Sequence, residues 1–179
     1  MNEFTLLVYL LSKKTNLDEI GTTKKEILKA LDVKDRNKSI YFQNLIIDFS
    51  KYLEPLGLKI RYNPLNAHWF ISFEHEVSNF LSANPFEGKP RLAATLFYVI
   101  VNCFKNNSIG KVQEIKKMRN KIGILNDLRE LEKKGYIKVQ KDKGEVRLTP
   151  LIAYQLDLNE LLLTLALDLK NEENGDFKV

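Results

Sequence analysis

Apolar positions between Arg91 and Thr149 first follow a helical spacing and then alternate with polar ones. This pattern predicts three helices, 92–104, 111–118 and 122–134, followed by strands 136–140 and 145–149 around a turn at 141–144. In the third helix, apolar side chains share one face: Ile124, Leu125, Leu128 and Leu131. Gly135 suits the left-handed position just past its end. Three helices and a hairpin in this order predict a winged helix-turn-helix.

The first half of the chain repeats the same order without a visible residue-level repeat. Its pattern predicts helices 4–11, 24–31 and 42–56, then strands 58–62 and 68–73, with loops at 16–21 and 63–67. Thr23 and Glu26 have the spacing of a capping box at the start of the second helix. The fold class is therefore α+β and mostly helical, with two tandem winged helix-turn-helix domains plus a C-terminal helix.

Proline and glycine mark the boundary between the two units. We expect an N-terminal domain over 1–81, ending in a short helix over 74–81, and a linker over 82–90 that holds two prolines and a glycine. The C-terminal winged helix then covers 91–149. A C-terminal apolar helix lies within 150–170, and 171–179 form a polar tail.

The last helix has almost no polar face, so burial is expected for it. Asp157 and Glu160 predict its capping box, and Leu156 with Leu161 a hydrophobic staple. Two interpretations stay open. The helix packs within this chain, or it forms a homodimer or partner interface. The candidate interface residues are Leu158, Leu161, Leu162, Leu165 and Leu169.

Positive charge is concentrated in the second unit. Residues 111–147 carry twelve basic and six acidic side chains, whereas 148–179 carry two and six. This surplus predicts either a nucleic-acid surface or a lysine-rich solvated face. The candidate DNA-binding residues are Lys116, Lys117, Arg119, Lys121, Arg129, Lys141, Lys143 and Arg147.

Three carboxylates on the third helix of this unit, Asp127, Glu130 and Glu132, oppose contact with phosphates. That helix also lacks a run of side chains suited to base edges. If DNA is bound, we expect weak, largely non-specific phosphate contacts. The matching helix of the first unit is apolar and nearly neutral, which argues against DNA contact there.

The sequence shows no recognisable catalytic or cofactor motif. Two histidines and the single Cys103 do not form a zinc-ligand spacing, and no phosphate-binding glycine loop is present. Cys103 lies in the most apolar helix and is expected to be buried. No membrane-length apolar stretch or signal peptide is recognised. We therefore expect a cytoplasmic protein that is not an enzyme, has no cofactor or metal, and works by binding.

Several motifs together resemble ScpB, the segregation and condensation protein B family. In the first half these are the residues from Leu45 to Arg61, LIIDFSKYLEPLGLKIR. In the second half they are PRLAATL from Pro90, VQEIKKMR from Val112 and LRELEKKGYI from Leu128. Asn120 follows Arg119 where the family usually has glycine, which indicates a divergent member. The resemblance covers residues 3–149.

The resemblance implies a non-enzymatic subunit of an SMC–kleisin complex. Such proteins form homodimers, commonly through their N-terminal winged helices. They hold an ScpA-like kleisin subunit that bridges the heads of an SMC ATPase, and so support chromosome condensation and segregation at the nucleoid. The alternative is a tandem winged-helix DNA-binding transcriptional regulator. A third interpretation is an interaction module unrelated to DNA.

Overall fold

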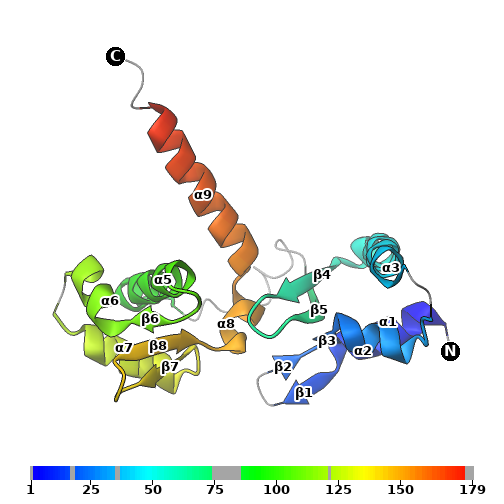
Figure 1. The fold of residues 1–179 in the computed structure, drawn as a ribbon, viewed down its shortest axis with the longest axis horizontal. Coiled ribbons are helices and arrows are strands. Elements are labelled where there is room, and N and C mark those ends of the chain that lie inside the picture. Colours follow the sequence, from blue (N-terminus) through cyan, green and yellow to red (C-terminus); the bar gives the residue numbers. More distant parts are fainter. Residues whose placement is uncertain (1, 17–18, 35–36, 74–85, 121, 176–179) are drawn as a thin grey trace.

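The computed structural model describes residues 2–16, 19–34, 37–73, 86–120 and 122–175. The N-terminal unit contains three helices followed by a hairpin (Figure 1). Its elements are α1 (Glu3–Ser12), α2 (Lys24–Ala30), α3 (Lys38–Leu53) with the 3-10 turn η1 (Glu54–Leu56), β4 (Leu58–Asn63) and β5 (His68–Phe73). The three predicted helices and the two strands of the predicted hairpin are confirmed, because the apolar stripes that predicted them line one core.

That core is formed where the apolar faces of the three helices meet. Its buried residues are Leu7, Leu11, Ile27, Phe42, Leu45, Phe49 and Leu53, and strand residues such as Ile60 and Trp69 pack against it. The predicted capping box is present, since Thr23 and Glu26 each bond to the other's backbone at the start of α2. The predicted short helix over 74–81 lies outside the described residues.

The C-terminal unit repeats this arrangement with a core of its own. It comprises α5 (Pro90–Lys105), β6 (Gly110–Lys111), α6 (Val112–Arg119), α7 (Ile124–Lys133), β7 (Ile137–Gln140) and β8 (Glu145–Leu148). Helix α5 begins at Pro90, one residue inside the predicted linker, because proline is well accommodated at the first helical position. Gly135 has a φ of 81° after the end of α7, as its position predicted.

Each unit also has a third strand that the sequence did not indicate. β3 (Thr22–Thr23) pairs antiparallel with β5, and β6 pairs antiparallel with β8, so the strand orders β3-β5-β4 and β6-β8-β7 correspond. These strands are two residues long and therefore show no alternation. The predicted loop over 16–21 was wrong: β1 (Lys14–Asn16) pairs with β2 (Glu19–Ile20).

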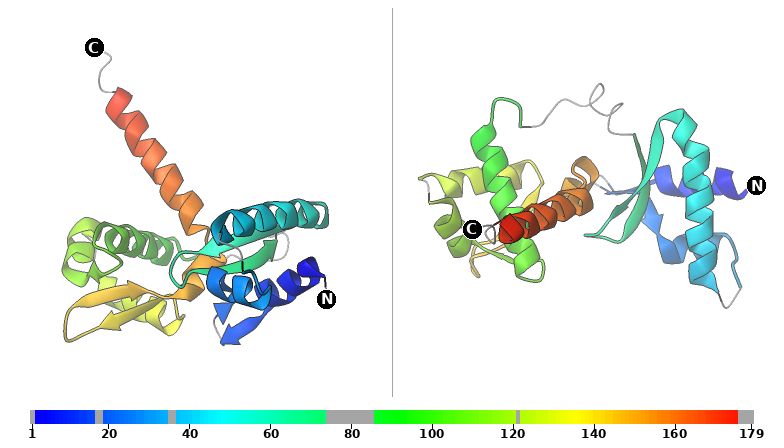
Figure 2. Two further views of the ribbon diagram at one scale, coloured as in Figure 1. Left: turned by 45° about the vertical axis from the view of Figure 1, so that its right-hand side comes forward. Right: turned by 90° about the horizontal axis from the view of Figure 1, so that it is seen from above.

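Two helices follow the second hairpin where one apolar helix was predicted. α8 (Pro150–Gln155) places Ile152 and Ala153 in the C-terminal core, together with Leu158, the first residue of α9 (Leu158–Gly175). Helix α9 then extends away from both units (Figures 1 and 2). Packing of the whole helix within this chain, one of the two interpretations of its apolar pattern, is not what the structure shows, whereas burial in an interface with another chain stays a prediction. Leu163 and Leu167 are 62% and 52% exposed, and among the described side chains of α9 those that contact the core, Leu158 and Leu161, belong to its start.

Candidate interaction surfaces

The predicted DNA-binding residues are distributed over three elements. Lys141 and Lys143 are exposed in the turn between β7 and β8, and Arg147 is exposed on β8 directly opposite Lys138 of β7. Lys116 and Lys117 are exposed in the last turn of α6, and Arg129 is exposed on α7. Lys121 lies outside the described residues. The hairpin thus carries a basic wing, defined here as Lys138, Lys141, Lys143 and Arg147.

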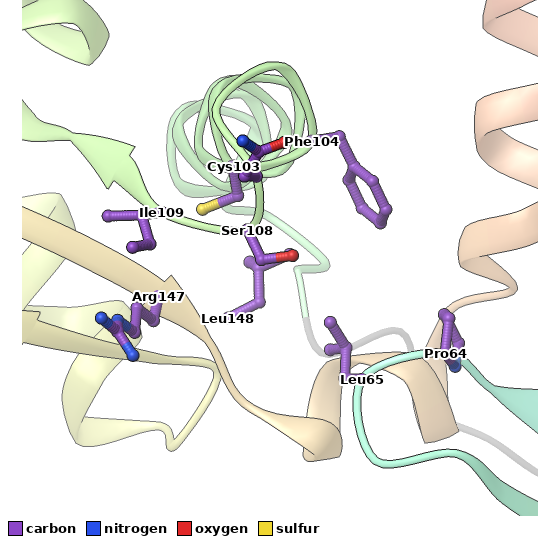
Figure 3. Close-up of a pocket in the computed structure, with 9 residues that line it drawn as sticks. Pro64, Leu65, Cys103, Phe104, Ser108, Ile109, Arg147 and Leu148 are labelled. Carbon is purple, nitrogen blue, oxygen red and sulfur yellow. The ribbon is translucent and has the colours of Figure 1, made fainter.

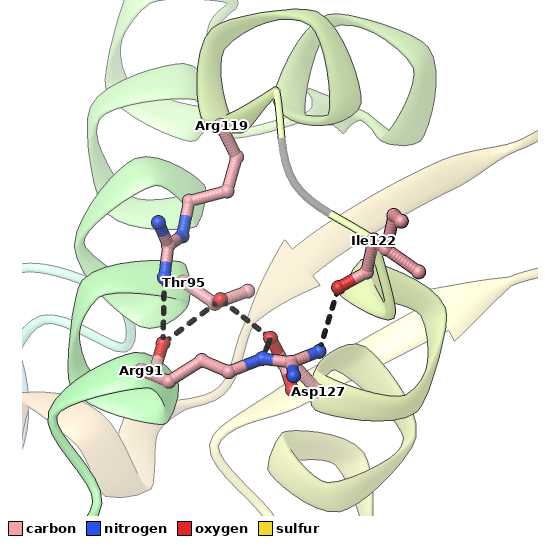
Figure 4. A network of polar contacts seen from close by, with 5 residues as sticks. All are labelled: Arg91, Thr95, Arg119, Ile122 and Asp127. Carbon is pink, nitrogen blue, oxygen red and sulfur yellow. Dashed lines mark hydrogen bonds and ion pairs between the residues drawn. The ribbon is translucent and has the colours of Figure 1, made fainter.

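Arg119 turns back onto its own domain. Its Nη2 atom donates to the backbone oxygen of Arg91 at 3.4 Å (Figure 4). Its guanidinium lies 6.0 Å from the centre of the Tyr98 ring. Its Nε atom is buried and has no hydrogen-bond partner among the described atoms. These contacts tie the end of α6 to α5, so Arg119 is held differently from the exposed lysines of the same helix.

The carboxylates of α7 are engaged by other parts of the chain. Asp127 accepts from Arg91 Nε at 3.1 Å and from Thr95 Oγ1 at 3.0 Å, and Arg91 also donates to the backbone oxygen of Ile122 (Figure 4). Glu130 forms an ion pair with Lys89 at 2.8 Å. Glu132 accepts from the backbone N–H of Val139. These side chains fasten α7 to α5 and β7, a role that the sequence alone did not indicate.

The outward side of α7 is therefore mixed rather than acidic. Leu125, Asn126, Arg129 and Lys133 are exposed along it, and Ile122, just before the helix, is 97% exposed. Arg129 Nη1 lies 3.4 Å from Asn126 Oδ1. Exposed apolar side chains at this surface favour contact with another protein more than reading of base edges.

The predicted interface leucines fall into two groups along α9. Leu158 is buried, Leu161 packs against the C-terminal core, and Leu162 is partly buried. Leu165 and Leu169 lie in α9, but their side chains are outside the described part of the structure. Among the leucines of α9 whose side chains are described, Leu163 and Leu167, which were not candidates, are exposed and lie one turn apart. The apolar sequence indicated that this helix carries an interface, but the orientation of the helix in the fold determines which of its leucines are exposed.

The root of α9, which means Asp157 and the first turn of the helix, is attached to the N-terminal unit. Arg61 of β4 forms an ion pair with Asp157 at 3.2 Å, and its Nη1 and Nη2 donate to the backbone oxygens of Tyr154 and Ala153 at the end of α8. A cation placed here also complements the negative end of the helix dipole. Asn159 Nδ2 donates to the backbone oxygen of Tyr62 at 3.4 Å. The sequence pattern gave no indication of this junction.

The turn of the first hairpin completes the junction. Asn63 is fully buried and donates to the backbone oxygen of Pro150 at 3.0 Å. Asn66 donates to the hydroxyl of Tyr154, and that hydroxyl donates to the backbone oxygen of Ile20 at 2.9 Å. The first wing is thus occupied by contacts inside the molecule, whereas the second wing is exposed.

A pocket of about 270 Å³ lies where this turn approaches the end of α5 and β8 (Figure 3). Pro64 and Leu65 line one side, and Phe104, Ser108 and Arg147 line the other. Cys103 also lines it but is 1% exposed, and burial raises the pKa of its thiol to about 11. The thiol is therefore neutral near pH 7 and unsuited to act as a nucleophile.

The described residues contain no group of three or more histidine, cysteine, aspartate or glutamate side chains arranged to hold a metal ion. Within the same part of the chain, none of the helices has the length and hydrophobicity that a bilayer crossing requires.

Comparison with known proteins gives matches among solved structures. No family model matches the sequence, and the curated proteins contain no match either. ScpB from Mycobacterium tuberculosis is similar over 86% of this chain and 92% of its own, at 13% identity and a TM-score of 0.32. A conserved hypothetical protein from Chlorobium tepidum is similar over 84% and 93%, at 13% identity and a TM-score of 0.36.

Proposed function

We propose that this chain is a non-enzymatic tandem winged-helix subunit of an SMC–kleisin complex, which binds the kleisin and supports chromosome condensation and segregation. The observation that carries the proposal is α9, an apolar helix that leaves the body of the protein with Leu163 and Leu167 exposed. Apolar side chains held away from a chain's own core are typical of a surface that another protein covers.

The anchoring of α9 supports a binding role. Its first residue is buried in the C-terminal core, and the contacts of Arg61 and Asn159 hold its root against β4. A helix fixed at one end presents its exposed leucines in a defined direction, which lowers the ordering cost of binding. An amphipathic kleisin helix packing along the Leu163–Leu167 stripe fits this geometry.

The winged helices support the same assignment. Ile122 and Leu125 are exposed beside the third helix of the C-terminal unit, where a sequence-reading protein would carry polar side chains for base edges. The sequence motifs resemble ScpB over residues 3–149, and this resemblance implies two such units that hold a kleisin. Homodimer formation through the N-terminal units follows from the same resemblance.

The test is affinity capture of the tagged full-length chain from nuclease-treated native lysate, read by mass spectrometry. We expect recovery of a kleisin and an SMC ATPase. The double variant Leu163→Asp with Leu167→Asp should lose both, whereas Leu163→Met with Leu167→Met should retain them because it keeps the apolar surface. If the aspartate variant recovered the kleisin and the SMC ATPase as well as the wild type does, α9 would not be the binding surface.

A tandem winged-helix transcriptional regulator is the alternative, and the exposed basic wing favours it. A regulator would bind one promoter fragment tightly, and the binding would weaken steeply with salt. Capture that recovers neither a kleisin nor an SMC ATPase, together with such binding, would select this alternative.

A further inference from the structure

A shallow groove in the N-terminal unit carries four lysines from three consecutive segments. It lies between α2 and the start of α3, has a volume of about 580 Å³, and is here named the α2–α3 groove. Its lining residues are Lys25, Leu28, Lys29, Asp32, Val33, Lys34 and Lys38. All four lysines are exposed. Asp32, the acidic residue among them, pairs with Lys34 at 3.2 Å with both side chains about four-fifths exposed, so this pair is weak.

The backbone adds positive potential to the same place. Helix α3 begins at Lys38, has no acidic residue in its first turn, and runs for 16 residues. The positive end of its dipole therefore faces the groove without compensation from its own first turn. The nearby carboxylate of Glu26 is held by Thr22 and Thr23 at the other end of α2. The groove thus combines exposed ammonium groups with a helix terminus.

The place of this groove in the fold indicates its ligand. It lies at the corner between the second and third helices of a winged helix-turn-helix, the part of the motif that meets the DNA backbone when such a motif binds a duplex. Ser39, Gln43 and Asn44 are exposed in the first half of α3, the helix whose start lines the groove. These side chains can donate to phosphate oxygens and base edges, whereas an acidic peptide would gain little from them.

The two units differ in a way that supports this interpretation. In the N-terminal unit the wing is bound to α8 through Asn63 and Asn66, whereas the lysines of the α2–α3 groove are exposed. In the C-terminal unit the corresponding corner is lined largely by apolar and neutral residues, with Lys116 as the basic one among the described residues. There the positive charge lies on the wing.

We propose that the α2–α3 groove binds duplex DNA through its backbone phosphates, with Lys25, Lys29, Lys34 and Lys38 as the contacting cations. This site is separate from the basic wing and does not depend on kleisin binding. The proposal differs from the expectation drawn from the composition of α3, because that expectation did not consider the lysines that the fold places beside the start of the helix.

The test measures fluorescence anisotropy of a short labelled duplex with the full-length protein across a salt series. The variant carries Lys25→Gln, Lys29→Gln and Lys38→Gln. Its matched control carries Lys13→Gln, Lys14→Gln and Lys51→Gln, three exposed lysines of the same unit outside the groove. We expect the groove variant to lose about tenfold or more in affinity at near-physiological salt, and its salt slope to fall by about 3. The control should retain most of the affinity.

Several results would overturn the proposal. Unchanged binding by the groove variant would do so, as would an equal loss in the control, since that would reflect net charge alone. The duplex affinity is also compared with and without the groove substitutions in a protein that already carries Lys141→Gln and Lys143→Gln. The groove substitutions must lower the affinity in that background as well. Stronger binding to single-stranded RNA or to polyglutamate than to the duplex would reassign the groove to that ligand. Circular dichroism melting of each variant confirms that the fold is retained.

Discussion

Arg61 Nε and Asp157 Oδ2 lie 3.2 Å apart and join β4 of the N-terminal unit to the root of α9. The arginine side chain is 12% exposed and the aspartate side chain 32% exposed, so water screens this pair less than it would a surface pair. The guanidinium also donates to Ala153 and Tyr154 and lies 5.4 Å from the centre of the Phe70 ring. One side chain thus links both units and the projecting helix.

Replacing Arg61 with methionine should destabilise the protein, because Asp157 and the two carbonyl oxygens lose their donor. We expect a fall of about 1–3 kcal/mol in the free energy of unfolding, measured by urea denaturation. Asp157→Asn should cost less, since Arg61 keeps its hydrogen bonds to the carbonyl oxygens. If Arg61→Met left the denaturation midpoint unchanged, the junction would not hold the units together.

The two parts of α9 should respond differently to mutation. Leu158→Ala removes a side chain that is 1% exposed, so we expect a loss of about 2–5 kcal/mol in thermal or urea unfolding. Leu163→Asp with Leu167→Asp changes exposed positions and should shift stability by only about 0.5 kcal/mol per site. A large destabilisation by the aspartate pair would mean that the distal part of α9 is buried in the protein in solution.

The basic wing should contribute to any DNA affinity of the C-terminal unit. Changing Lys141, Lys143 and Arg147 to glutamate should weaken duplex binding and flatten its salt dependence, with the slope falling by about 1 for each phosphate that is no longer neutralised. Replacing the same residues with glutamine removes their positive charge without adding negative charge. This variant therefore separates the loss of attraction to phosphates from the repulsion that glutamate adds. Binding and slope equal to those of the wild type would show that the wing does not bind DNA.

The capping box of α2 should make stability depend on pH in the acidic range. Hydrogen bonds from Thr22 and Thr23 lower the pKa of Glu26 from 4.5 to about 2. Because the folded-state pKa is the lower one, the contribution is present above pH 4.5 and is lost as the pH falls toward 2. Glu26→Gln should therefore be less stable than the wild type at neutral pH, and the difference should shrink on acidification. A difference that is constant with pH would contradict this account.

Removing the threonine of the same capping box measures its contribution to stability independently of Glu26. Thr23→Ala deletes the side chain that accepts from the backbone N–H of Glu26. We expect a loss of about 1 kcal/mol in the free energy of unfolding. Thr23→Ser keeps the hydroxyl and should recover most of that stability, which separates the cap from the packing of the threonine methyl group.

The sequence by itself determined the two three-helix units and their hairpins, because burial of one face per element imposes periods of about 3.6 and 2 on the chain. It also indicated local devices such as the capping box, the glycine after α7 and the buried Cys103. Each of these depends on residues that are near in sequence or on hydrophobicity alone. The sequence pattern did not predict the two-residue strands β3 and β6, because these strands form only by pairing with a hairpin that is distant in sequence.

Only the tertiary structure decided which polar and apolar side chains remain available for partners. The sequence predicted that Asp127 and Glu130 oppose contact with phosphates. In the structure they form ion pairs with Arg91 and Lys89, which are distant in sequence. The leucines of α9 predicted burial within the chain or in an interface, and in the single chain Leu163 and Leu167 are exposed because the helix extends away from the core. The α2–α3 groove likewise forms because the turn between two helices places separate lysines side by side. Charge and hydrophobicity are local properties of the sequence, whereas exposure and partnership follow from how distant segments are packed.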